Sequence, residues 1–222
     1  MQNPVPHIIR NNTFWASPDR CLFWEEQNTL IIADMHLGKT GRIRKSGITI
    51  PPSIYKTDLK RLMAQLYLFK VDRLIIAGDL TYSAANKELD LFIKWRKDFS
   101  LLHIDLVKGN PDMPDDSWYA EANINVIAEK MISGPFLFMH DLKLQQTLTE
   151  EEKLYYTFSG HMHPAISIKG KGKQSLRFPC FYFAKDFCVL PAFSRFAASY
   201  QVTPEKDETV FAVVENSIVQ MN

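Results

Sequence analysis

Four short apolar runs, each followed within three residues by a carboxylate, an amide or a histidine, mark this chain up to residue 140. The runs at 30–33, 74–77 and 136–139 are continuous in apolar residues, and the fourth spans 101–107. Such β-rich runs are typical of buried strands in a central sheet. In open α/β sheets, ligands gather beyond the carboxyl ends of the strands. The sequence therefore predicts one site to which strands distant in sequence contribute.

The polar residues at these positions offer imidazole, carboxylate and amide-oxygen ligands. They are Asp34 and His36, then Asp79, Asn110 and His140, and finally His161 and His163. This mixed set suits divalent ions such as manganese, iron or zinc, and seven groups are too many for one ion but match two. Asp34 and His36 are two residues apart, as are His161 and His163, so each pair is expected to lie on one face of an extended chain and to hold one ion. Two metals indicate phosphoester chemistry.

The remaining periodicity predicts the elements around this site. Residues 53–69 and 86–97 carry apolar side chains at helical spacing, which predicts two amphipathic helices. From 165 onward the helical spacing is absent, and apolar runs at 176–183, 187–190, 210–214 and 217–219 predict antiparallel strands of a second sheet. The sequence thus predicts an α/β protein with a two-sheet β-sandwich flanked by helices.

The order of the motifs, D-x-H, G-D, G-N-x-D, H and G-H-x-H, resembles the calcineurin-like metallophosphoesterase superfamily over residues 34–163. Further residues, namely His36, Lys39, Arg44, Gly47, Pro51 and the segment 191–193, are similar to bacterial ligase-associated metallophosphoesterases of the PdeM-like kind. The resemblance implies a four-layer fold and a metal-dependent phosphoesterase.

The resemblance also implies roles for the ligand residues. Asp34, His36 and His163 would hold the first metal, Asn110, His140 and His161 the second, and Asp79 would bridge the two. Catalysis would fall to Asp79, Asn110, His36 and His163, with manganese as the first choice of metal and iron or zinc as alternatives. Pro111 stands where the family usually has a histidine that helps protonate the leaving group. We therefore expect metal binding to persist and the catalytic rate to be reduced.

A basic segment follows the first ligand pair and contains Lys39, Arg42 and Arg44. Two interpretations remain open for these residues, a substrate-phosphate clamp or a solvated surface. Asp112 and Asp141 each follow a ligand residue and are expected either to orient an imidazole or to be solvated turn residues.

Three functions remain open at this stage. The first is a nuclease-type phosphodiesterase that acts on DNA or RNA in repair. The second is a small-molecule phosphatase or pyrophosphatase, which the formal net charge of +1 favours because it argues against a large uniform basic surface. The third is a weakly active metal-binding partner of a DNA ligase or helicase, which Pro111 suggests.

Length and composition limit the number of domains and indicate the cellular location of the protein. The 222 residues, 46% of them hydrophobic, are enough for one sizeable core, so a single domain over 1–222 is expected. Cys21, Cys180 and Cys188 form no C-x-x-C pair and fit reduced structural thiols. No apolar stretch approaches the ~18 residues of a membrane helix. The sequence predicts a cytoplasmic protein without a membrane partner and leaves the oligomeric state open.

Overall fold

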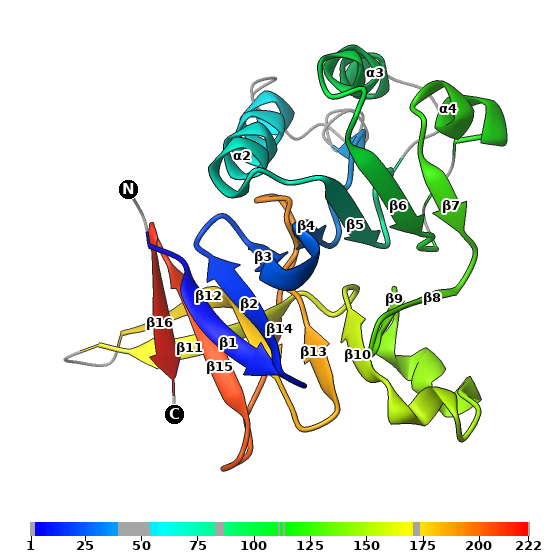
Figure 1. The fold of residues 1–222 in the computed structure, drawn as a ribbon. Helices are drawn as coiled ribbons and strands as arrows, with labels where there is room; N and C mark the ends of the chain where they lie inside the picture. The colour runs from blue at the N-terminus through cyan, green and yellow to red at the C-terminus, as the bar shows by residue number, and fades with distance from the viewer. Residues whose placement is uncertain are drawn as a thin grey trace.

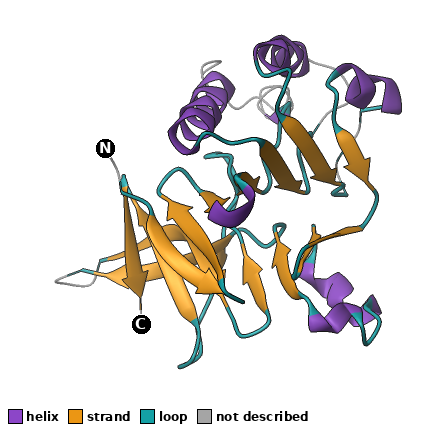
Figure 2. Ribbon diagram, viewed as in Figure 1, coloured by secondary structure: helices purple, strands orange, loops and turns teal. Residues whose placement is uncertain are grey.

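Two β-sheets pack face to face, and the three α-helices in the described part of the chain cover the outer face of the first sheet (Figure 1). The computed structural model describes residues 3–39, 54–82, 87–110, 112, 114–170 and 174–221. Figure 2 shows the long helices on one side of the first sheet, away from the second sheet. The predicted fold class, a two-sheet sandwich flanked by helices, is confirmed.

The first sheet contains seven strands among the described residues, in the order β1-β2-β3-β4-β5-β6-β7. Their bounds are β1 Val5–Ile9, β2 Asn12–Ser17, β3 Cys21–Trp24, β4 Thr29–Ile32, β5 Arg73–Ala77, β6 His103–Val107 and β7 Asn125–Ile127. Strands β1 to β4 pair antiparallel, whereas β4 to β7 pair parallel. The runs at 30–33, 74–77 and 101–107 are thus strands of one sheet, as predicted, and the carboxyl ends of β4, β5 and β6 meet at one edge.

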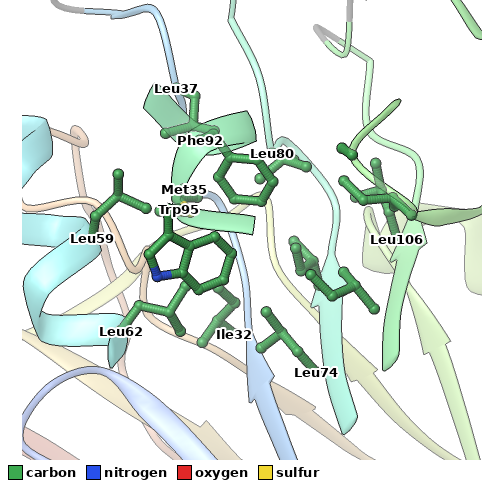
Figure 3. Close-up of a cluster of buried hydrophobic side chains, with 14 of the residues drawn as sticks. Ile32, Met35, Leu37, Leu59, Leu62, Leu74, Leu80, Phe92, Trp95 and Leu106 are labelled. Carbon is green, nitrogen blue, oxygen red and sulfur yellow. The ribbon is translucent and has the colours of Figure 1, made fainter. Parts of the chain in front are cut away.

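The helices of the first sheet are α2 Ile54–Phe69, α3 Lys87–Asp98 and α4 Asp116–Glu121, and a 3₁₀ turn, η1 Glu25–Gln27, precedes β4. Both predicted amphipathic helices are therefore present. Figure 3 shows Phe92 and Trp95 of α3 in the same buried cluster as Leu59 and Leu62 of α2. None of the helices in the described residues has the length and apolar character needed to cross a membrane.

The second sheet contains nine strands among the described residues, and β14-β11-β12-β13-β10-β9-β8 is its main order. Their bounds are β8 Lys130–Ser133, β9 Phe136–Met139, β10 Tyr156–Ser159, β11 Pro164–Lys169, β12 Ser175–Phe183, β13 Phe187–Val189, β14 Tyr200–Gln201, β15 Thr209–Val214 and β16 Ser217–Met221. Two 3₁₀ segments, η2 Leu142–Thr147 and η3 Glu152–Leu154, lie between β9 and β10.

One sequence prediction about this sheet was wrong, because the run at 136–139 is β9 of the second sheet and not a strand of the first. The predicted antiparallel pairing is confirmed for β12 with β13 and β15, and for β15 with β16. The sheet as a whole is mixed, because β10 pairs parallel with both β9 and β13. The η2–η3 segment supplies the crossover that a parallel β9–β10 pair needs. A continuous apolar run reports burial on both faces, which is equally true of a central strand in either sheet.

Successive side chains of a strand point to opposite faces of its sheet, and this alternation divides the core into layers. Leu30 and Ile32 of β4 face the helices, whereas Ile31 faces the second sheet. From the second sheet, Phe136 and Phe138 pack into this inter-sheet layer. Because both faces of β4 and β5 are buried in this way, the edge at which these strands end is fixed in position.

Asp105 of β6 links neighbouring strands through its buried carboxylate. Arg73 donates from Nε to Asp105 Oδ2 at 2.7 Å and from Nη1 to Ser133 Oγ of β8 at 2.9 Å. Asn125 of β7 donates to Asp105 Oδ1 at 2.7 Å. Through Arg73, the carboxylate therefore connects the two sheets.

We expect Asp105→Ala to lower the free energy of unfolding by about 2–4 kcal/mol, because the change leaves Arg73 and Asn125 without their acceptor. Urea unfolding followed by circular dichroism measures this. Asp98→Ala, at an exposed position at the end of α3, is the matched control and should change stability by less than about 0.5 kcal/mol. Equal stability of the two variants would contradict the assignment of Asp105 as a link between strands.

Candidate metal centre

The carboxyl ends of three strands bring three of the predicted ligands together. Asp34 follows β4, Asp79 follows β5 and His140 follows β9, and all three side chains are buried. His140 Nε2 lies 3.1 Å from Asp79 Oδ1, and His140 Nδ1 lies 3.8 Å from Asp34 Oδ1. Residues of both sheets therefore contribute to the same site.

Six of the predicted ligands form two clusters. Asp34, His36 and His163 make the first cluster, and Asp79, His140 and His161 make the second, with the donor atoms of each cluster within 4.8 Å of one another. Asp79 stands between the clusters, since its Oδ2 lies 3.5 Å from His36 Nε2 of the first cluster. Three carboxylate or imidazole donors at this spacing can hold a divalent ion in each cluster.

The backbone at the ligands differs from the extended chain that the sequence suggested. Asp34, His36, Asp79, His161 and His163 all have left-handed φ angles, of 55°, 54°, 47°, 65° and 49°. Such residues are uncommon outside glycine and gather at functional sites, where the surrounding structure holds them. The two-residue spacing suggested that His161 and His163 hold one ion, whereas the family resemblance assigned them to different metals. In the structure the chain turns between them, and they lie in different clusters.

Several buried oxygen and nitrogen atoms that could bind metal in the clusters have no hydrogen-bond partner among the described residues. They include Asp34 Oδ1, Asp79 Oδ1 and His163 Nε2. Buried polar atoms are almost always satisfied, so such a group needs an explanation. Each of these atoms belongs to one of the two clusters, and a cation bound there would satisfy it. The residues present therefore fit a pair of metal ions.

Glycines give the ligands the space they occupy. A Cβ at Gly109 would lie 2.0 Å from Asp79 Oδ1, and a Cβ at Gly160 would lie 2.5 Å from Asp34 Oδ2. Gly78, with φ of 85°, would place a Cβ 1.9 Å from His140 Nδ1. The sequence shows these glycines in its motifs, but only the structure shows that each lies against a carboxylate or imidazole of the site.

Asp112 ties the loops of the site to each other. Its Oδ2 accepts from the Gly109 N–H at 2.8 Å, and its Oδ1 accepts from the Thr81 N–H at 2.8 Å. Burial raises the pKa of this carboxyl group. Of the two roles left open by the sequence, neither fits fully: Asp112 is no solvated turn residue, and it holds backbone rather than an imidazole. Asp141 does approach an imidazole, with its Oδ2 3.7 Å from His161 Nε2.

The remaining predicted site residues lie outside the two clusters or outside the described residues. Asn110 lies at an exposed position directly after Gly109, and its role as a ligand stays a prediction. Lys39 is close enough to the clusters that Asp34 and Asp79 act on it: burial lowers the pKa of Lys39, and the two carboxylates oppose this. Arg42, Arg44 and Pro111 lie outside the described residues.

His163 shows how the chain prepares an imidazole for a ligand role. Its Nδ1 lies 2.8 Å from the carbonyl oxygen of Ala198, which can only accept, so the ring carries a proton on Nδ1. Its Nε2 points to Asp34 Oδ1 at 3.4 Å. Burial lowers the pKa of His163, but the adjacent negative charge of Asp34 and the Ala198 carbonyl outweigh burial and raise the pKa overall.

The segment 191–193 is adjacent to the first cluster. The Phe193 N–H donates to the Ala33 carbonyl at 2.7 Å, and the Ser194 N–H donates to the Asp34 carbonyl at 3.2 Å. These bonds hold the backbone at Asp34. Without the family resemblance, no pattern in the sequence would have marked this segment as part of the site.

The fold and the paired clusters define a protein with a metallophosphoesterase-type two-sheet sandwich. Among solved structures, the chain is similar to the nuclease MPE of Pseudomonas putida, with 26% sequence identity, coverage of 95% of this chain and 97% of that one, and a TM-score of 0.79. It also matches Yfce, a phosphoesterase from E. coli, at 13% identity, coverage of 87% and 97% and a TM-score of 0.46. No protein-family model and no curated protein sequence matches.

We expect Gly109→Ala to weaken metal binding by about 10–100-fold, because the added methyl group displaces the Asp79 carboxylate. Metal content after gel filtration, measured by inductively coupled plasma mass spectrometry, tests this. Gly170→Ala is the matched control, since the nearest atom to its Cβ is 4.0 Å away. Full metal content in Gly109→Ala would argue against Asp79 as a shared ligand.

Proposed function

We propose that this protein is a metal-dependent phosphoesterase that hydrolyses phosphodiester bonds at a dinuclear centre. The observation that carries the proposal is the position of Asp79 between two clusters of buried donors. In this proposal Asp34, His36 and His163 hold one ion and Asn110, His140 and His161 hold the other, with Asp79 shared. Manganese is the first choice of metal, with iron or zinc as alternatives.

Bound divalent ions supply Lewis acidity, which activates water and neutralises phosphate oxygens. The chain's own residues position the reactants. The Ala198 carbonyl fixes the His163 ring so that Nε2 faces the site. The ammonium group of Lys39, partly buried beside Asp34 and Asp79, can contact an anionic oxygen of the substrate. Aromatic contact with Tyr82, whose ring centroid is 5.5 Å from Lys39 Nζ, helps to hold that side chain.

For the substrate we propose a nucleic acid. The similarity to a nuclease over nearly the whole chain supports this choice. A role in DNA repair, and a DNA ligase or helicase as partner, rest on the resemblance of the motifs to ligase-associated proteins. Three free buried cysteines support a reducing cytoplasmic setting. A small-molecule phosphatase remains the second candidate because the net charge is only +1.

Asp79→Asn tests the dinuclear centre. We expect it to lose at least one ion per chain and to lower turnover of bis-(4-nitrophenyl) phosphate by about 100-fold or more, because Lewis-acid stabilisation contributes several kcal/mol to such reactions. Metal analysis and the release of nitrophenol measure the two effects. Asp98→Asn, at an exposed position, is the control. Wild-type metal content together with wild-type turnover in Asp79→Asn would refute the proposal.

Pro111 leads to a second prediction about the same reaction. Proline has no side-chain or backbone proton to donate, so the site should favour leaving groups that depart unaided. General acids contribute about 10²–10⁴-fold, so nitrophenyl esters should be cleaved far faster than alkyl phosphodiesters. Pro111→His should raise alkyl-ester cleavage more than aryl-ester cleavage. If the wild type cuts both esters equally fast and the variant brings no gain, then another residue supplies the proton.

A further inference from the structure

The segment 193–200, which leads into β14, is bound at both ends to the first cluster. Near its start, the Ser194 N–H donates to the Asp34 carbonyl at 3.2 Å. Near its end, the Tyr200 N–H donates to the His163 carbonyl at 2.9 Å. Figure 1 shows this segment in orange, passing from the second sheet toward β4 and α2. Any side chain that it exposes is therefore held next to the metal centre.

Two aromatic side chains of this segment are exposed. Phe196 is 40% exposed and Tyr200 is 64% exposed. Within the described part of the chain, neither ring contacts another aromatic ring. A single exposed aromatic residue needs no explanation, but here two of them lie on one segment whose backbone is bonded to two candidate metal ligands.

Two arginines hold the same segment from beneath, and a third is exposed on it. Arg20 donates from Nη1 to the Ser194 carbonyl at 3.0 Å, and the Arg61 guanidinium lies 4.3 Å from the centroid of the Phe193 ring. Arg195 is exposed. Asp58, 3.2 Å from Arg61, is an acidic partner for this group. Burial, together with the charges of Arg61 and Arg195, lowers the pKa of Arg20 to about 10, although Asp58 and Asp19 oppose the shift.

Exposed aromatic rings beside an exposed cation, here Arg195, are a combination that proteins use for single strands. Each base has a π-face that stacks on an aromatic ring, while cations follow the phosphate backbone. In a duplex the bases stay stacked inside the helix and cannot reach such rings. A small phosphate ester has no base to stack.

We propose that Phe196 and Tyr200 form a stacking platform for the unpaired bases of a single-stranded polynucleotide. The platform rests on the proposed function, because the strand it holds would present its phosphodiester to the metal centre. Phe196 and Tyr200 would thereby determine specificity for unpaired over paired strands.

Binding of a fluorescent oligothymidylate to the full chain, followed by anisotropy without added metal, tests the platform. Phe196→Ala and Tyr200→Ala should each weaken binding by at least about 5-fold. Tyr200→Phe should bind within about twofold of wild type, whereas Tyr200→Leu should resemble the alanine variant, because stacking requires a ring. Tyr67→Ala, which removes a 68% exposed ring from α2, is the matched control.

An abasic strand of the same length separates stacking from general effects on the fold. Wild type should bind this strand at least about 5-fold more weakly than the oligothymidylate. The alanine variants should bind the abasic strand as wild type does. Parallel titrations with DNA and RNA strands identify which sugar the site accepts. The affinity for a blunt duplex should be the same in wild type and in both alanine variants.

The outcomes distinguish the platform from the phosphodiesterase proposal. Wild-type affinity of both alanine variants, or an equal loss for the abasic strand, would overturn the platform even if nitrophenyl diesters are hydrolysed. A base-dependent loss of affinity in a protein that hydrolyses no diester would support the platform and overturn the phosphodiesterase proposal.

Discussion

Asp34 is fully buried where the two sheets meet. The arrangement of the site depends on the hydrogen bonds that hold this residue. Its N–H donates to the Gly78 carbonyl at 3.2 Å, and its carbonyl accepts from Ser194 at the same distance. Its Oδ2 accepts from the His161 N–H at 2.9 Å. A buried carboxylate is costly unless it is hydrogen-bonded or paired. The loops that satisfy Asp34 therefore have to converge, and in doing so they bring the histidines of both clusters together.

Packing of the sheets makes this convergence rigid. Strands β4 and β5 are buried on both faces, so the loops that follow them begin from fixed positions. Left-handed backbone at Asp34, Asp79 and His163 costs conformational energy, which the surrounding contacts offset. Gly109 and Gly160 remove the side chains that would otherwise occupy the space of the carboxylates. The donors are thus held close together before any ion binds.

The residues proposed to hold metal and those proposed to contact substrate lie on different parts of the chain. The donors of the clusters follow buried strands, whereas Arg195 and Phe196 lie on the segment between β13 and β14, and Tyr200 begins β14. Loops on a rigid scaffold can change without loss of the fold, so the same centre can serve different phosphoesters. A chain with a net charge of +1 can still concentrate arginines locally, as Arg20, Arg61 and Arg195 do beside the first cluster.

The sequence by itself determined the strands at 30–33 and 74–77, both long helices and the residue types of the donor set, because burial and helical periodicity are local signals. It did not determine that the run at 136–139 joins the second sheet, since a fully apolar run is compatible with any central strand. Residue spacing also paired His161 with His163, whereas the motif resemblance separated them, and the left-handed backbone at both residues places them in different clusters. Asp112 and the segment 193–200 gained their roles only from contacts across the fold. Local pattern fixes which residues are buried or can bind metal, but long-range packing decides which of them meet.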